Sequence, residues 1–353
     1  MRAIDQTKPI LVTGGSGYIA GWIIRYLLEA GLTVRATVRN TGRRDKVLHL
    51  TRLATSLPGT LRLFSADLLT PGDFDDAMQG CELVVHTASP FVLDKPKNAR
   101  ETFIQPALEG TRNVLEAANA VETVKRVVLT SSAAAVYGDV GDMAGIEDGM
   151  LTEAHWNTTS TESHQPYSYS KTVAEQAAWE MSRAQDRWDL VTVNPAMVLG
   201  PSLTRSTASG SVALLKQYGD GTLRFGVPEL SFGVVDVRDA ARAHIDAAFT
   251  PGASGRHLLS AGVVRLIDIG RILKAHFGDG FPFPTRIAPK FIIWLIAPLF
   301  GMTREYVKKN VGYTLRLDNS RSVDDLGVAY RPIEQTIVDH FQQLIDDGLV
   351  KRK

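Results

Sequence analysis

Residues 9–20 read PILVTGGSGYIA, a short apolar run followed by three glycines in four positions and the start of a second apolar pattern. The run PILVT predicts a buried strand. From Tyr18 to Ala30 apolar side chains recur at helical spacing, and the pattern stops before Gly31, which predicts a helix. The segment therefore predicts a strand, a tight turn and a helix in that order.

This arrangement is typical of a loop that binds a pyrophosphate. Gly14 permits the tight turn, Gly17 lets the backbone approach phosphate oxygens, and Ala20 is small enough for the helix to pack on a sheet. The start of the helix also offers unpaired N–H groups and the positive end of its dipole. The segment predicts a dinucleotide site with contacts from Thr13, Gly14, Ser16, Gly17, Tyr18 and Ile19.

The following sequence alternates β-branched runs with longer helical patterns, as expected for a parallel sheet with crossover helices. We expect helices at 101–120 and 169–184 and strands at 33–38, 60–65, 83–87, 126–130, 190–193, 233–237 and 256–260. The sequence thus predicts an α/β fold with a Rossmann-type, doubly wound parallel sheet. Residues 1–194 and 232–262 would form the nucleotide-binding domain, and residues 195–231 and 263–353 a smaller, interleaved substrate-binding region.

The end of the second strand indicates which dinucleotide is bound. Enzymes that use NAD usually carry an acidic residue there for the ribose 2′-hydroxyl, whereas NADP needs a cation for its 2′-phosphate. This chain has Arg39 at that position and no carboxylate before Asp45. Because arginine can hold a phosphate through two parallel hydrogen bonds, we expect NADP(H) as the cofactor.

Residues after the third and fourth strands extend the expected cofactor site. Asp67 and Leu68 follow the third strand, where they could hold the adenine ring, although Asp67 suits a turn cap equally well. Thr87, Ala88 and Ser89 follow the fourth strand, at the height where the ribose and phosphates should pass.

A Tyr-x-x-x-Lys pattern supplies the candidate chemistry. Tyr167 and Lys171 are four residues apart and share one face of a helix, so the ammonium can lie beside the phenol. A neighbouring cation lowers the tyrosine pKa from about 10, which makes the phenol a usable general acid or base. Ser131 and Ser132 follow Thr130, itself an expected cofactor contact, and one of the two hydroxyls can hold a substrate oxygen in the same cleft.

Together these motifs resemble the extended short-chain dehydrogenase/reductase superfamily, and within it the dihydroflavonol, cinnamoyl-CoA and yeast methylglyoxal reductases. The resemblance implies a Rossmann fold with a parallel sheet of about seven strands. It also implies that Ser132, rather than Ser131, is the catalytic serine. The matching stretches are VTGGSGYIA (12–20), ATVRN (36–40), HTASPF (86–91), RVVLTSSAAAV (126–136), TEAHW (152–156), YSYSKTVAEQAAWE (167–180), VNPAMVLGP (193–201) and VVDVRDAARAH (234–244).

The resemblance implies further cofactor contacts and shows one departure. Pro195 and Val198 would line the nicotinamide, and Lys46 would join Arg39 at the 2′-phosphate. Many members of the superfamily carry an active-site asparagine three residues before a glycine, on the helix that precedes the strand 126–130. Here that position is Ala107, so a proton relay at this place would need a water molecule.

The bulk composition restricts the partners. The 353 residues carry a net charge of +1 without a basic block, which argues against nucleic acid as a ligand. The single cysteine, Cys81, excludes an intrachain disulfide and fits a reducing compartment. The apolar stretch 291–300 is shorter than the roughly 20 residues that span a bilayer. We expect a cytoplasmic monomer or homodimer that binds no nucleic acid, membrane or metal.

The expected reaction is the reversible reduction of an aldehyde or ketone by NADPH, with Tyr167 as the proton donor. Phe91 and Tyr137 would line the substrate beside Ser132 and Tyr167. A cluster of late aromatic residues suggests an apolar or aromatic substrate, although each suits a core position as well; its members are Phe281, Phe283, Phe291 and Trp294.

Other functions fit parts of the pattern. A hydroxysteroid dehydrogenase has a similar architecture. An epimerase or dehydratase of nucleotide sugars shares the same three catalytic residues, but usually holds NAD tightly and needs a site for a nucleotide diphosphate. A redox sensor could bind NADP without turnover, yet would not need Tyr167, Lys171 and Ser132 together.

Overall fold

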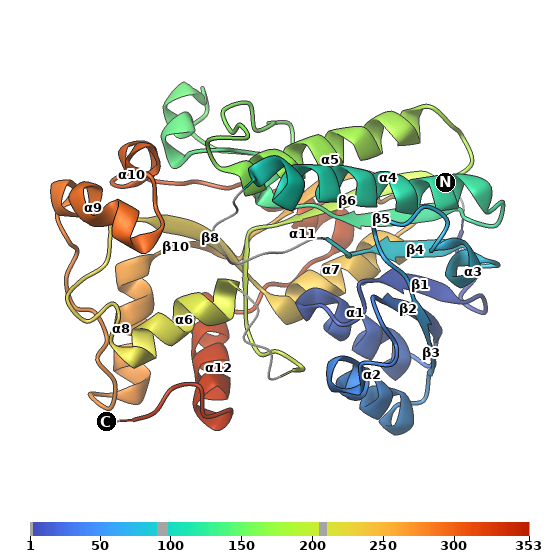
Figure 1. Ribbon diagram of the computed structural model, residues 1–353, viewed down its shortest axis with the longest axis horizontal. Coiled ribbons are helices and arrows are strands. Elements are labelled where there is room, and N and C mark those ends of the chain that lie inside the picture. The colour runs from blue at the N-terminus through green and yellow to red at the C-terminus, as the bar shows by residue number, and fades with distance from the viewer. Residues whose placement is uncertain (1–2, 90–97, 205–209, 353) are drawn as a thin grey trace.

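The computed structural model describes residues 3–89, 98–204 and 210–352. Its main sheet has seven parallel strands in the order β3-β2-β1-β4-β5-β6-β9, which confirms the Rossmann-type fold (Figure 1). The order reverses between β1 and β4, where sheets of this kind bind ligands. The strands are β1 (Ile10–Thr13), β2 (Thr33–Val38), β3 (Thr60–Ser65), β4 (Leu83–His86), β5 (Arg126–Thr130), β6 (Asp189–Pro195) and β9 (Gly255–Leu259).

Helices cover both faces of this sheet, because side chains of a strand alternate between the faces. Ile10 and Val12 of β1 point into one core, and Leu11 points into the other. The first core is shared with α1 (Tyr18–Glu29), α2 (Arg44–Ser56) and α7 (Val237–Phe249). The second is shared with α3 (Asp75–Met78), α4 (Gln105–Ala120) and α5 (Pro166–Arg183).

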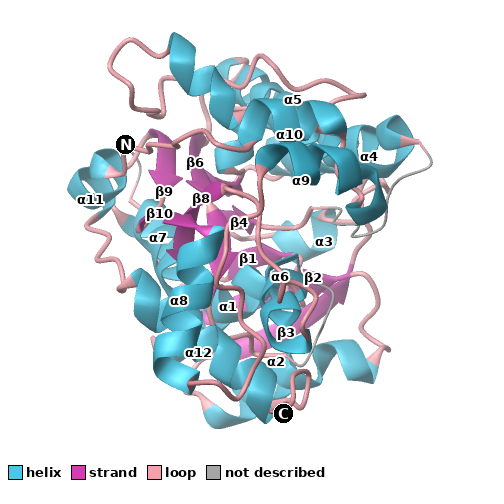
Figure 2. Cartoon of the chain, turned by 90° about the vertical axis from the view of Figure 1, so that its left-hand side faces the viewer, coloured by secondary structure: helices cyan, strands magenta, loops and turns pink. Residues whose placement is uncertain are grey.

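A second sheet of three strands lies beside the first, in the order β10-β8-β7 (Figure 2). We predicted that both late strands join the main sheet, but only β9 does. The other, β8, pairs with β7, a short strand that follows the end of β6 at Pro195. The new elements are β7 (Met197–Leu199), β8 (Ser231–Asp236), β10 (Gly262–Arg265), and the surrounding helices α6 (Gly210–Asp220), α8 (Leu266–Phe277) and α12 (Ile333–Asp346).

Two predicted helices differ from the observed ones at their starts. The helix predicted from residue 169 begins at Pro166, because proline lacks the N–H that the first turn leaves unpaired anyway. Tyr167 therefore lies in the first turn of α5. The helix predicted over 101–120 is divided into a π-helical turn, η1 (Arg100–Ile104), and α4, because Pro106 cannot donate to the carbonyl of Thr102.

The late aromatic residues are divided between the core and the surface. Phe281 and Phe283 are buried, with ring centroids 5.1 Å and 5.4 Å from that of Phe341 in the core around the second sheet. Phe291 is 72% exposed and Trp294 42% exposed. The latter two belong to a projecting hairpin formed by α9 (Lys290–Ile296), the short helix η4 (Ala297–Phe300) and α10 (Arg304–Asn310) (Figure 1).

Candidate active site

The glycine turn between β1 and α1 has the geometry of a phosphate loop. Gly14 has a φ of +68°, and a Cβ there would lie 2.7 Å from the Cα of Ala88, so no other residue fits without a shift. The N–H of Gly15 donates to the carbonyl of Thr37 at 2.8 Å, which holds the turn against β2. Gly17 precedes α1 and provides no side-chain cap, so the first N–H groups of the helix are available to a ligand.

The side chains of two residues predicted to contact the cofactor at this turn, Tyr18 and Thr13, form hydrogen bonds within the protein. The hydroxyl of Tyr18 donates to the carbonyl of Gly200, so its ring points toward the second sheet. The hydroxyl of Thr13 lies 2.8 Å from Nδ1 of His86 and accepts from the N–H of Ala88 at 3.1 Å. Burial lowers the pKa of His86 to about 3, so this histidine is neutral, and its contact with Thr13 joins β4 to β1.

Exposed cations follow β2, at the end that faces the turn. Arg39 and Lys46 are both exposed. Arg43 is instead engaged by Asp45, at 3.0 Å. Arg39 and Lys46 are therefore accessible from solvent, and their contact with a 2′-phosphate stays a prediction.

Asp67, which follows β3, caps a turn. This was one of the two roles that the sequence allowed for it, the other being contact with the adenine ring. Oδ1 of Asp67 accepts from the N–H of Leu69 at 2.9 Å, which is the hydrogen bond of an Asx turn. Leu68 packs against Gly110 of α4, whose added Cβ would lie 3.1 Å from the Leu68 side chain. Asp67 thus has a structural hydrogen bond, and an adenine contact stays a prediction.

The structure brings Ser132 and Tyr167 together. Ser132 follows β5, and its Oγ accepts from the N–H of Ala134 at 3.1 Å, in the first turn of the 3-10 helix η2 (Ala133–Ala135). Burial raises the pKa of the Tyr167 phenol, and a hydrogen bond with Ser132 lowers it. The neighbouring Ser131 turns away and donates to Glu175 at 2.6 Å. Of the two serines, Ser132 is therefore the one that faces the phenol.

Lys171 lies one helical turn beyond Tyr167 and beside the predicted cofactor residues. Its Nζ is 5.9 Å from the centroid of the Tyr167 ring and donates to Oγ of Ser89 at 2.8 Å. Burial lowers the pKa of Lys171 to about 8, and the carboxylate of Glu175 acts in the opposite direction. The ammonium is therefore held in a buried position between α5 and the end of β4.

A buried ion pair under Lys171 was not predicted from the sequence. Glu175 is fully buried, and its Oε1 accepts from Nε of Arg256, on β9, at 2.7 Å. Asn194 and Thr192 of β6 donate to the same carboxylate at 2.7 Å and 3.1 Å. Glu175 could have been suspected because it lies four residues after Lys171, on the same helical face. Its partner is 81 residues away and left no local signal.

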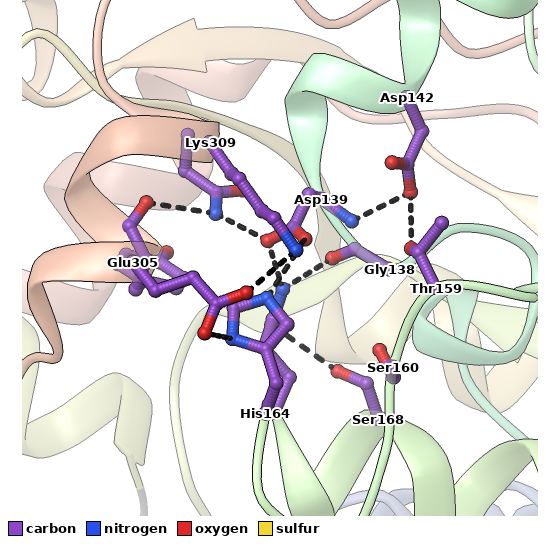
Figure 3. Close-up of polar contacts among 12 residues, drawn as sticks. Gly138, Asp139, Asp142, Thr159, Ser160, His164, Ser168, Glu305 and Lys309 are labelled. Carbon is purple, nitrogen blue, oxygen red and sulfur yellow. Dashed lines mark hydrogen bonds and ion pairs between the residues drawn. The ribbon is translucent and has the colours of Figure 1, made fainter.

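A second polar cluster fixes the start of α5. Gln165, with a φ of 54°, has a left-handed backbone, and its Nε2 donates to Oδ1 of Asp139 at 2.6 Å and to the carbonyl of Gly138 at 2.6 Å. Asp139 is buried and also accepts from Nδ2 of Asn310 at 2.6 Å, while Nε2 of His164 lies at 2.8 Å (Figure 3). The residues just before Tyr167 are thus tied to α10.

A small cavity adjoins Ala107, the position at which the sequence predicts that a water molecule would be needed for a proton relay. The cavity measures about 20 Å³, which is enough for one water molecule. Its lining includes Ala107, Ser131, Lys171 and Glu175. The space next to Lys171 is therefore lined by both polar and apolar groups and has room for one water molecule.

The remaining predicted contacts lie on several different elements. Phe91 is outside the described residues. Pro195 ends β6, and Val198 belongs to β7. The Thr130 hydroxyl is 2.7 Å from Nε2 of a histidine on α7. Tyr137 lines a hollow of about 410 Å³, whose described lining includes none of the three candidate catalytic residues.

Comparison with known proteins identifies the family of this chain. A model of the NAD dependent epimerase/dehydratase family matches residues 10–258. Cinnamoyl-CoA reductase CAD2 of Medicago truncatula is 38% identical over 98% of this chain and 98% of its own length. Tetraketide alpha-pyrone reductase 1 of Arabidopsis thaliana is 35% identical over the same shares of both chains.

A solved structure extends the similarity to three dimensions. Yeast methylglyoxal/isovaleraldehyde reductase, solved as a complex with NADPH, is 27% identical with a TM-score of 0.76, covering 97% of this chain and 100% of its own. The glycine loop, the Ser132–Tyr167–Lys171 arrangement and these relatives lead to the same assignment: the chain belongs to the NAD dependent epimerase/dehydratase family, and within it to the reductases of the extended short-chain dehydrogenase/reductase group.

Proposed function

We propose that this protein reduces an apolar or aromatic aldehyde or ketone to the alcohol with NADPH, and that Tyr167 donates the proton. Its relatives make the chain an oxidoreductase that uses NADP and acts on carbonyl groups. The proposal adds the identity of the acid and the kind of substrate.

The observation that carries the proposal is that three polar side chains lie together at the carboxyl ends of the central strands. Ser132 faces the phenol of Tyr167, and the ammonium of Lys171 lies 5.9 Å from the ring of that tyrosine. The contact between Lys171 and Ser89 places the ammonium next to β4, beside the switch point where a dinucleotide fits. A proton donor, its tuning cation and an oxygen-binding hydroxyl therefore share one location.

The glycine loop and the exposed Arg39 fit NADPH, because they offer backbone N–H groups to a pyrophosphate and a guanidinium to a 2′-phosphate. When bound, NADPH supplies the hydride that forms the new C–H bond at the carbonyl carbon. Ser132 orients the carbonyl oxygen by a hydrogen bond. Tyr167 transfers its phenolic proton to that oxygen, and Lys171 stabilises the phenolate that results.

The kind of substrate is supported by the names of the relatives. Two of them are reductases of cinnamoyl-CoA and of tetraketide α-pyrones. Near the site, Tyr137 packs with Val136 and Leu151 in a small apolar cluster directly after the turn that carries Ser132. We therefore expect a flat or apolar group attached to the carbonyl carbon.

The proposal is tested by incubating the purified protein with NADPH and a panel of carbonyl compounds, and by following the nicotinamide absorbance. The panel contains cinnamaldehyde, an aliphatic ketone, a steroid ketone and a nucleotide sugar. Oxidation of NADPH with the aromatic or apolar aldehydes and ketones is the expected result. Conversion of the nucleotide sugar without net loss of NADPH would indicate an epimerase or dehydratase. NADPH binding without turnover of any compound would indicate a sensor.

A further inference from the structure

An apolar face is exposed on the hairpin that contains α9 and η4. Figure 1 shows α9 at the edge of the molecule, on the side away from α1 and α2, and in Figure 2 it faces the viewer. Monomeric proteins rarely gather so many large apolar side chains on one exposed segment. The face is formed by Phe291 (72% exposed), Ile292 (39%), Trp294 (42%), Leu295 (62%), Leu299 (84%) and Phe300 (59%).

The opposite side of the hairpin is packed into the protein, so the orientation of the exposed face is fixed. Ile293, Ala297 and Val307 are buried in the core around the second sheet. Nζ of Lys290 donates to the carbonyl of Val311 at 2.6 Å, which ties the start of α9 to the end of α10. Nδ2 of Asn310, at the end of α10, in turn donates to Oδ1 of Asp139 at 2.6 Å. The hairpin therefore presents a preformed surface.

The segment that carries this face is rich in basic side chains. Residues 286–310 contain five basic residues and one acidic residue, a net charge of +4, whereas the whole chain has +1. The guanidinium of Arg304 lies 4.5 Å from the centroid of the Trp294 ring, so a cation directly borders the apolar surface. The acidic residue, Glu305, pairs with Lys309 at 2.8 Å. The other basic residues are Arg286, Lys290 and Lys308.

We propose that α9 and η4 form a docking face for the surface of a membrane that contains anionic lipids, which departs from the expectation, drawn from the sequence, that no membrane is bound. An apolar helix face with tryptophan, phenylalanine and leucine, bordered by lysine and arginine, settles at the boundary between headgroups and acyl chains. The cations then meet the negative surface potential. Among the described residues, no helix is long and apolar enough to cross a bilayer, so the contact is peripheral.

The charge favours a lipid surface over a second copy of this chain. In a two-fold dimer through this face, each copy would bring the same net charge of +4 against that of its partner. Such like charges repel across an interface. Anionic headgroups instead complement the basic border while the acyl region receives the aromatic and aliphatic side chains.

The test measures co-sedimentation of the purified full-length protein with vesicles. One set consists of phosphatidylcholine alone, and the other contains one third phosphatidylglycerol. We expect binding to the anionic vesicles, little binding to the neutral ones, and weakening as salt rises. The double variant L299S/F300S should lower the partition coefficient about tenfold or more, because it removes two exposed apolar side chains. Lys308→Glu should weaken only the binding to anionic vesicles.

A matched control separates this face from apolar exposure in general. Phe225 is 81% exposed and has Arg224 at 4.4 Å from its ring centroid, but it lies outside the hairpin. Phe225→Ser should leave vesicle binding unchanged. Equal loss in Phe225→Ser and L299S/F300S, or no binding of the wild type to anionic vesicles, would overturn the proposal. So would light scattering that shows a dimer which only L299S/F300S dissociates. Thermal melting and NADPH turnover establish that each variant is folded.

Discussion

The amide nitrogen of Gln165 lies 2.6 Å from a carboxylate oxygen of Asp139, and this hydrogen bond fixes the backbone two residues before the candidate acid Tyr167. Gln165 has the left-handed φ of 54° that few residues other than glycine adopt readily. The bond therefore holds a strained residue at the point where α5 begins. We infer that Gln165 is a positioning residue for the phenol.

Replacing Gln165 with glycine tests this role without imposing backbone strain. Glycine accepts the left-handed conformation but lacks the amide, so we expect kcat to fall about tenfold, on the order of 1.4 kcal/mol in the barrier, while the KM for NADPH stays unchanged. Steady-state kinetics and thermal melting measure the two effects. Ser163→Gly, two residues earlier on the exposed loop, is the control. A loss of melting temperature with unchanged kcat would assign Gln165 to stability alone.

The pH dependence of reduction should report the buried lysine. Burial lowers the pKa of Lys171 to about 8, so the cation that stabilises the phenolate is lost above that pH, and kcat/KM should fall there. Glu175 raises the pKa of Lys171. Glu175→Gln should therefore move the alkaline fall to lower pH. Glu180→Gln, an exposed change on the same helix, should not move it. A shift of the fall to higher pH in Glu175→Gln would contradict this electrostatic role.

Stability should depend strongly on the ion pair between Glu175 and Arg256. Both side chains are buried, so Arg256→Met leaves a carboxylate without its charge partner and should lower the free energy of unfolding by about 3–5 kcal/mol. The surface pair of Arg265 and Asp268 has a similar distance, 2.6 Å, and Arg265→Met should cost about 1 kcal/mol or less. Urea denaturation measures both. The double variant with Glu175→Gln should recover part of the loss, and strictly additive losses would argue against the pairing.

The choice of cofactor should depend on Arg39. Arg39→Ala removes the cation beside the predicted 2′-phosphate position, so the KM for NADPH should rise at least about tenfold while the KM for NADH changes little. Arg52→Ala, an exposed change on α2, should alter neither value. Steady-state kinetics with both cofactors measure these KM values. Equal increases in the KM for NADPH and for NADH would mean that Arg39 does not bind the 2′-phosphate.

Local sequence patterns predicted the parts of this protein that depend on neighbours along the chain. Each of these patterns can be recognised in a short stretch of sequence. They are the glycine turn, the alternation of strands and helices, and the one-turn spacing of Tyr167 and Lys171. All seven strands of the main sheet and the family follow from them, as does the expectation that one of two adjacent serines faces the phenol.

The features that were missed depend on partners far apart in the chain. Asn310 reaches Asp139 across 171 residues, and Arg256 reaches Glu175 across 81. An apolar residue pattern likewise does not tell whether a side chain meets another element. The sequence therefore led to the same expectation for Phe281 and Phe291, although the first is 4% exposed and the second 72%. The pairing of β8 with β7 rather than with the main sheet has the same cause.

The most direct test of the proposed chemistry is the rate of NADPH oxidation by Tyr167→Phe, with the best carbonyl substrate of the panel. Without the phenolic proton the rate should fall about 10²–10⁴-fold, while NADPH binding, followed by fluorescence, is retained. Tyr169→Phe, two residues along the same helix, should keep full activity. Undiminished turnover by folded Tyr167→Phe would contradict the assignment of Tyr167 as the proton donor.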